Sequence, residues 1–182
     1  MACRNLHENS LGGELPTFLW TLSEMKYMYL SKNNFIGSVP PQIGNLKNIQ
    51  ILYLSSNNFN GLLPSEIGNL EKMRIICLYG NNFIGSLPSE IGNMKNLQVL
   101  YLSRNKFEGE ISNSLGNLTK LRRLYLGFNN LSGDLPNSIF NVPTLEIMYL
   151  NNNFYGGLPN KKSDKFLIIN LANNQFSTQD IE

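Results

Sequence analysis

An asparagine recurs every 24 residues along most of the chain, and this period constrains the fold more than any other feature of the sequence. The recurrent residues are Asn9, Asn33, Asn57, Asn81, Asn105, Asn129 and Asn153, and Asn174 follows after 21 residues. Periods of about 20 to 50 residues are typical of proteins made of stacked repeats rather than of one globular core. The period therefore predicts a solenoid.

Each repeat also places three apolar residues before its asparagine. Around Asn57 they are Ile49, Leu52 and Leu54, and the last two alternate with an outward residue, as in a short strand with one buried face. The equivalents are Met25, Met28, Leu30; Met73, Ile76, Leu78; Leu97, Leu100, Leu102; Leu121, Leu124, Leu126; Leu145, Met148, Leu150; and Phe166, Ile169, Leu171. One such unit cannot bury its apolar face alone, so we expect neighbouring strands to pair in parallel at about 4.8 Å.

Asparagine, glycine and proline take fixed places in the repeat. The chain has 29 Leu and 28 Asn among its 182 residues. The asparagine side chain has donors and an acceptor, so we expect it to hold the backbone of a buried turn. The recurrent glycines should adopt positive φ or lie close to the next coil; they are Gly37, Gly61, Gly85, Gly109 and Gly133. Prolines that follow, as in GSVP and GLLP, should begin an outer segment.

The frame L-x-x-L-x-L-x-x-N, followed by Gly-x-[Ile/Leu/Val]-Pro, resembles the plant-type leucine-rich repeat. Seven copies are recognisable, after a degenerate first coil in which Met1 and Arg4 occupy apolar slots. The resemblance implies an α/β-type solenoid: a right-handed superhelix with a parallel β-sheet on its concave face and short 3-10 or irregular turns on its convex face. We expect residues 1–182 to form one such array.

The same resemblance implies a function. Proteins with this repeat are extracellular receptor-like kinases and receptor-like proteins of plants, and less often secreted inhibitors of pathogen cell-wall enzymes. The resemblance implies a peptide or protein ligand and a co-receptor as a further partner. It also implies that the protein is secreted or lies on the extracellular side of the plasma membrane. The usual terminal caps and a signal peptide are not evident, which suggests an excised middle. A secreted inhibitor and a truncated remnant without its own role are the alternatives.

The residue between the second and third apolar slots should point out of the core, onto the concave face. In this column stand five tyrosines, with Cys77 and Asn170 at the other two positions: Tyr29, Tyr53, Tyr101, Tyr125 and Tyr149. Two residues earlier lies a second column that is apolar except for Arg123. Exposed aromatic surface is typical of interaction sites, so the tyrosines are candidate ligand-binding residues. The alternative is a ladder that only stabilises neighbouring strands.

Charged residues and one phenylalanine complete the candidate ligand-binding set. The predicted concave face has Lys32, Arg104 and Arg123 but no Asp or Glu, which favours a ligand with acidic groups. Some receptors of the family that the sequence resembles use two closely placed arginines for a ligand carboxylate, but here Arg123 is followed by Tyr125 two residues later, so this role is not assigned. Phe128 stands at the rim and is a candidate ligand-binding residue. The alternative interpretation is that its ring packs under the neighbouring loop, because the repeat is expected to bury phenylalanine elsewhere.

Two sequons and two cysteines give further expectations. Asn117 and Asn130 begin Asn-x-Ser/Thr sequences outside the predicted strands, so they are candidate glycosylation sites that would leave the concave face open. Cys3 and Cys77 are three repeats apart, about 14 Å, which is too far for a disulfide.

Several functional classes are disfavoured. The single histidine, His7, has no nucleophile or base beside it in the repeat frame, and we expect no enzyme activity from this segment. We expect no metal, no cofactor and no nucleic acid, because no ligand spacing, phosphate-binding glycine loop or long basic run is present. The sequence contains no stretch of about 18 apolar residues, the length that a membrane-spanning helix requires.

Overall fold

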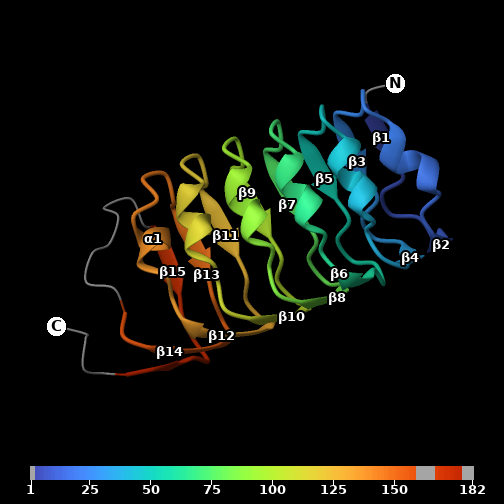
Figure 1. Ribbon diagram of the computed structural model, residues 1–182. Helices are drawn as coiled ribbons and strands as arrows, with labels where there is room; N and C mark the ends of the chain where they lie inside the picture. The colour runs from blue at the N-terminus through green and yellow to red at the C-terminus, as the bar shows by residue number, and fades with distance from the viewer. Residues whose placement is uncertain (1–2, 159–166, 178–182) are drawn as a thin grey trace.

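The computed structural model describes residues 3–158 and 167–177. Across these residues the chain forms a solenoid whose coils lie side by side in sequence order, from the N-terminal coil to the C-terminal one (Figure 1). A complete coil has a strand of an inner sheet, a turn at the recurrent asparagine, a second strand, and an outer helical turn. The solenoid predicted from the period and from the family resemblance is therefore confirmed.

The inner sheet has eight parallel strands within the described residues, in the order β1-β3-β5-β7-β9-β11-β13-β15. Neighbouring strands pair one whole repeat apart, so that Leu52 lies opposite Ile76, except that the final pair joins Met148 to Ile169. Its strands are β1 (Cys3–Asn5), β3 (Tyr27–Tyr29), β5 (Ile51–Tyr53), β7 (Ile75–Cys77), β9 (Val99–Tyr101), β11 (Arg123–Tyr125), β13 (Ile147–Tyr149) and β15 (Ile168–Asn170).

A second set of parallel strands follows the asparagine turns, and the sequence did not predict it. Residues such as Asn60 and Gly61 have low strand propensity; these strands form because each coil edge pairs its backbone with the next coil. The described strands are β2 (Gly12–Glu14) with β4 (Asn34–Ile36), and the six-stranded set β6 (Asn60–Leu62), β8 (Asn82–Gly85), β10 (Lys106–Gly109), β12 (Asn130–Asp134), β14 (Asn153–Gly156) and β16 (Gln175–Phe176).

The outer face consists of short helical turns, as expected. They are the 3-10 helices η1 (Thr17–Thr21), η2 (Pro41–Asn45), η3 (Ser65–Asn69), η4 (Ser89–Asn93) and η5 (Asn113–Asn117), and the short α-helix α1 (Asn137–Phe140). Proline precedes most of them, as at Pro64 and Pro88. Close packing between coils requires glycine here, since a Cβ on Gly68 would lie 2.5 Å from the carbonyl oxygen of Glu90. Trp20 and Phe140 replace this glycine and are buried.

The core is continuous along the solenoid. It is built from the three apolar slots of the repeats between Met25 and Leu150, with Ile169 and Leu171 packed against it, and from a stack of phenylalanines that follows the asparagine turns. The rings of Phe35, Phe59, Phe83 and Phe107 are stacked, with centroids 5.9–6.4 Å apart. The recurrent glycines beside this stack have positive φ, as predicted: Gly37 (84°), Gly61 (74°), Gly85 (72°), Gly109 (78°) and Gly133 (87°).

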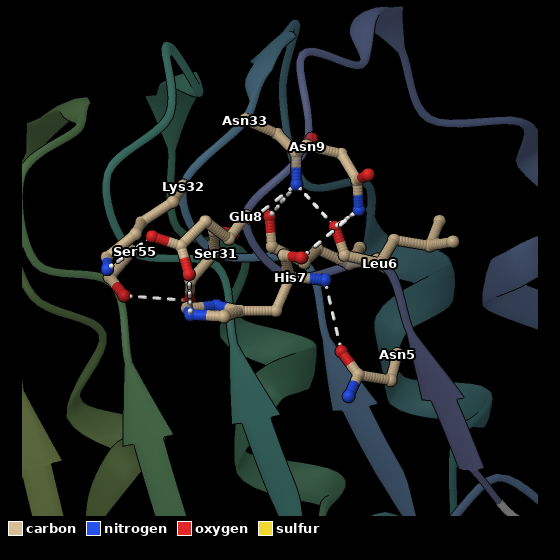
Figure 2. A network of polar contacts seen from close by, with 10 residues as sticks. Asn5, Leu6, His7, Glu8, Asn9, Ser31, Lys32, Asn33 and Ser55 are labelled. Atoms are coloured by element: carbon tan, nitrogen blue, oxygen red, sulfur yellow. Dashed lines mark hydrogen bonds and ion pairs between the residues drawn. The ribbon is translucent and has the colours of Figure 1, made fainter.

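The recurrent asparagine joins successive coils. Asn81 is buried, and its Nδ2 donates to the carbonyl oxygens of Leu54 in the previous coil and Leu78 in its own, both at 3.0 Å. Its Oδ1 accepts the backbone N–H of Phe59 at 3.0 Å. Asn33, Asn57, Asn105 and Asn129 make equivalent bonds. Figure 2 shows the pattern at the first coils, where the amide of Asn33 lies against Leu6. Each asparagine thereby fixes the phase between two coils.

The period fails at one repeat. The asparagine expected in this role is Asn153, whose side chain lies outside the described part of the structure. Asn152 donates instead to the carbonyl oxygen of Leu126 at 3.0 Å and accepts the N–H of Asn129 at 2.9 Å. Unlike its equivalents in the other repeats, Asn152 does not have a positive φ, so the turn is displaced by one residue. The apolar residue expected at Phe166 also lies outside the described residues.

We predict that Asn81→Ala lowers the free energy of unfolding by about 3 kcal/mol, because it leaves the buried N–H of Phe59 without a partner and removes one of the two amide bonds to each of the carbonyl groups of Leu54 and Leu78. Urea denaturation followed by circular dichroism measures this. The matched control is Asn58→Ala, since the Asn58 side chain is exposed and makes no hydrogen bond within the described residues. Equal losses in the two variants would contradict a role of the amide in joining coils.

Candidate functional site

The predicted file of tyrosines exists on the concave face, but it is divided in two. Tyr29 and Tyr53 form one pair, with ring centroids 5.4 Å apart. Tyr101, Tyr125 and Tyr149 form a second group, with successive centroids 4.6 and 5.3 Å apart. All five side chains are half-buried, because each ring covers part of its neighbour on the next strand. The tyrosines are therefore not one continuous stripe.

Tyr79 extends the second group and was not predicted. Cys77 interrupts the file on β7, and Tyr79, two residues later, places its ring 5.1 Å from that of Tyr101. The sequence contains a signal for this, because the equivalent residues in the other described coils are small or polar: His7, Ser31, Ser55, Ser103, Gly127, Asn151 and Ala172. One large aromatic residue in such a column points to a local role. Tyr79 thus joins the three downstream tyrosines rather than the upstream pair.

Arg104 and Phe128 border this group at the rim where the inner strands end. The guanidinium carbon of Arg104 lies 5.8 Å from the centroid of the Tyr79 ring and 5.5 Å from that of Phe128. The cation is therefore placed between two aromatic rings, an arrangement worth about 0.5–1 kcal/mol per contact at exposed sites. Phe128 is 58% exposed. The alternative expectation, that Phe128 packs under the neighbouring loop, is wrong.

These side chains enclose a hollow of about 290 Å³, which we call the aromatic hollow. It is defined by six side chains: Tyr79, Tyr101, Tyr125, Tyr149, Arg104 and Phe128. Ser103 and Asn151 also line it and add polar groups. The hollow thus combines a large aromatic surface with one cation, which suits a ligand with apolar side chains and an acceptor group.

The backbone places Arg104 and Phe128 at the rim. Both have left-handed φ, 56° and 58°, and so do the equivalent Lys32 and Ser56, whereas Gly80 holds the same place in one coil. A non-glycine residue pays about 1–2 kcal/mol for this conformation, and the cost is highest for bulky residues. The asparagine turn imposes the conformation on every described coil except the one that contains Asn152. Phe128 therefore has the backbone cost of a bulky residue in this conformation, while its exposed ring gains little burial in return.

The aromatic hollow contains one positive charge, that of Arg104, among neutral hydrogen-bond donors. Burial is the main cause of the raised pKa of the Tyr101 phenol, and the neighbouring Tyr79 and Cys77 add to it, while Arg104 lowers it. The phenol therefore stays protonated at neutral pH and can donate a hydrogen bond. None of the ion pairs within the described residues includes Arg104. Its N–H groups are available to a ligand.

The remaining candidates lie elsewhere. Arg123 is exposed on β11 and does not line the aromatic hollow, so the two concave arginines are not brought together. Lys32 at the rim of the second coil bonds to Glu8, with Nζ and Oε1 3.2 Å apart, and His7 lies beside the same carboxylate (Figure 2). Asn117 and Asn130 are exposed, at the end of η5 and the start of β12.

Other site types find no support in residues 3–158 and 167–177. No three His, Cys, Asp or Glu side chains gather there as a metal site would require. None of the described helices is both long and apolar enough to span a bilayer. Cys3 and Cys77 are both free, in agreement with the predicted lack of a disulfide.

Comparisons with known proteins agree with this architecture. The leucine-rich repeat region family matches residues 3–163. The ectodomain of the Arabidopsis thaliana receptor kinase GASSHO1/SCHENGEN3, solved with CASPARIAN STRIP INTEGRITY FACTOR 2, is 40% identical at a TM-score of 0.92, over 97% of this chain and 22% of that chain. A TDR receptor is 32% identical at a TM-score of 0.94, over 96% and 31%. The comparison with curated proteins found no match.

A further similar structure is the Arabidopsis receptor kinase HAESA in complex with the peptide hormone IDA and the co-receptor SERK1. It is 27% identical at a TM-score of 0.78, over 97% of this chain and 34% of that chain. The chain thus spans about a third or less of these receptor ectodomains. Ectodomains with this fold are typically non-catalytic. The chain belongs to the leucine-rich repeat family, of the plant type found in receptor kinase ectodomains.

Proposed function

We propose that this chain is a ligand-binding leucine-rich repeat module from the extracellular domain of a plant receptor-like kinase or receptor-like protein. Its function is binding rather than catalysis, and the ligand is a peptide or protein that lies along the concave face. The observation that carries this proposal is the aromatic hollow. The ectodomains of GASSHO1/SCHENGEN3 and HAESA, which share its fold, were each solved with a ligand, and this supports the assignment.

The composition of the aromatic hollow suits a peptide. Tyrosine offers a large rigid contact surface and a polar tip, and it loses little conformational entropy on binding. The four tyrosines stand on successive coils, so an extended segment that crosses the coils would meet one ring after another. Arg104 supplies a donor for a carbonyl or carboxylate of the segment. A co-receptor would then contact the complex from outside the hollow.

We predict that Tyr101→Ala combined with Tyr125→Ala raises the Kd for a bound peptide by about 30-fold or more, the effect of losing interface hot spots. The probe is a peptide selected on the wild-type chain from a random displayed library, and calorimetry measures its Kd. The matched control is Tyr29→Ala with Tyr53→Ala, which removes a pair of neighbouring tyrosines outside the hollow. Equal losses in both double variants, or no loss in the first, would contradict the proposal.

A second prediction separates binding from stability. Phe128→Gly relieves a left-handed φ of 58° and gives up one ring contact to Arg104, so the melting temperature should stay within about 2 °C of wild type or rise. The Kd for the same peptide should rise about tenfold. Ser56→Gly removes the same backbone cost outside the hollow and should leave binding unchanged. A large drop in melting temperature for Phe128→Gly would instead assign the ring a structural role.

The two sequons fit an extracellular module. We propose that Asn117 and Asn130 carry N-linked glycans, because both are exposed and neither lines the aromatic hollow. Expression in a plant secretory system should give a mass above 20.6 kDa that falls when glycans are removed enzymatically. Asn117→Gln and Asn130→Gln should each lower the mass of the secreted chain by that of one glycan. A mass that enzymatic treatment does not change would contradict the proposal.

A further inference from the structure

The side of the solenoid where the inner strands begin carries two polar columns with a period of two repeats. The columns flank the first apolar slot of each coil, and alternate coils supply Asn-x-Gln and Lys-x-Arg. The residues are Asn48 and Gln50, then Lys72 and Arg74, then Asn96 and Gln98, then Lys120 and Arg122. Thr144 and Glu146 follow in the next coil. We call Lys72, Arg74, Lys120 and Arg122 the basic strip.

The alternation has a structural consequence. Lys72 Nζ donates to Asn48 Oδ1 of the previous coil at 2.6 Å, and Lys120 Nζ donates to Asn96 Oδ1 at 2.8 Å. Asn48 and Asn96 are themselves held by backbone carbonyl groups one coil further back. A neutral amide therefore orients each ammonium group without neutralising its charge. Because the two lysines are two coils apart, their charges repeat at about 10 Å.

The arginines differ in their partners. Arg74 is exposed and takes part in none of the ion pairs of the described residues. Arg122 donates through Nε and a terminal nitrogen to Glu146 Oε1, at 2.9 and 2.7 Å. Beside this pair, a hollow of about 280 Å³ is lined by Gln98, Lys120, Arg122, Thr144 and Glu146. It presents both donors and acceptors, which sugar hydroxyl groups require.

We propose that the basic strip binds a linear anionic polysaccharide with a carboxylate on its sugars. Lys72, Arg74 and Lys120 would pair with carboxylates, and the polar hollow would hold hydroxyl groups. A polymer with a carboxylate on every sugar needs no fixed register on the strip, because some carboxylate lies close to each pair of cations wherever the polymer binds. Among the acids near the strip, Glu71 precedes Lys72 in sequence, Glu24 occupies the lysine column two coils before Lys72, and Glu146 is already paired with Arg122.

The surface favours a polysaccharide over an acidic protein. Stable protein interfaces have an apolar or aromatic centre. Most of the exposed large apolar side chains of the described residues lie elsewhere, on the second strands, at the rims and in the terminal coils: examples are Leu62, Ile84 and Phe128. Leu167 follows Glu146 in the column of Arg74 and Arg122, but it stands two coils beyond Arg122, outside the basic strip. The basic strip is also separate from the aromatic hollow, because the two lie at opposite ends of the inner strands. The second site is thus independent of the proposed peptide site.

Electrophoresis of the 182-residue chain through gels that contain sodium polygalacturonate tests this proposal. At low salt the polymer should retard the chain, and Lys72→Gln with Lys120→Gln should weaken the retardation by about fivefold or more. The matched control is Lys47→Gln with Lys106→Gln, which removes the same charge from exposed lysines outside the strip. Retardation should also fall as salt rises, because these cations are exposed.

Four outcomes would overturn the proposal. They are an equal loss in the control variant, equal retardation by fully methyl-esterified polymer, stronger retardation by polyglutamate than by polygalacturonate, and loss of retardation in the Tyr101→Ala, Tyr125→Ala variant. The third would identify an acidic protein as the partner. The fourth would place the polymer at the concave face. Retention of polymer binding in the tyrosine variant supports two separate sites, whether or not that variant still binds peptide.

Discussion

A buried asparagine amide that bonds to two coils is the interaction on which the rest of this structure depends. Asn81 reaches the carbonyl of Leu54 and the N–H of Phe59 in the preceding coil while it bonds to Leu78 in its own. A buried amide is stable only when these groups are all paired, so neighbouring coils have little freedom to slide. The strand register of one repeat and the stacked phenylalanines are consistent with this fixed phase.

Because neighbouring coils keep this fixed phase, equivalent residues of successive repeats line up and form continuous surfaces. A side chain at one place in the repeat stands beside its equivalents on both sides, and the surface becomes locally distinct where particular coils depart from the repeat. Tyr79 and Phe128 are two such departures, and with Arg104 they change a plain tyrosine ladder into the aromatic hollow. The alternation of Asn48 and Lys72 is a third departure, with a period of two coils, at the opposite end of the strands.

Two binding surfaces on one short array are physically reasonable for a solenoid. Each coil contacts only its neighbours, so the two ends of its inner strand can change without disturbing each other. The aromatic hollow offers rigid rings and one unpaired cation, whereas the basic strip offers exposed cations on a polar surface. The first suits recognition of a peptide and the second suits a charged polymer. The chain spans only part of the length of the similar ectodomains.

Periodicity alone determined the solenoid, the inner strands and the buried asparagines, since each follows from spacing between neighbours along the chain. It also identified most of the residues that line the aromatic hollow, because an outward place on a strand is a local property. Tertiary packing decided the rest. The sequence already placed Cys77 within the tyrosine column, but only the positions of adjacent coils show that Tyr79 joins the downstream tyrosines and that Arg123 lies outside the hollow. The second strands and the shift to Asn152 likewise depend on backbone pairing between coils, which no single repeat encodes.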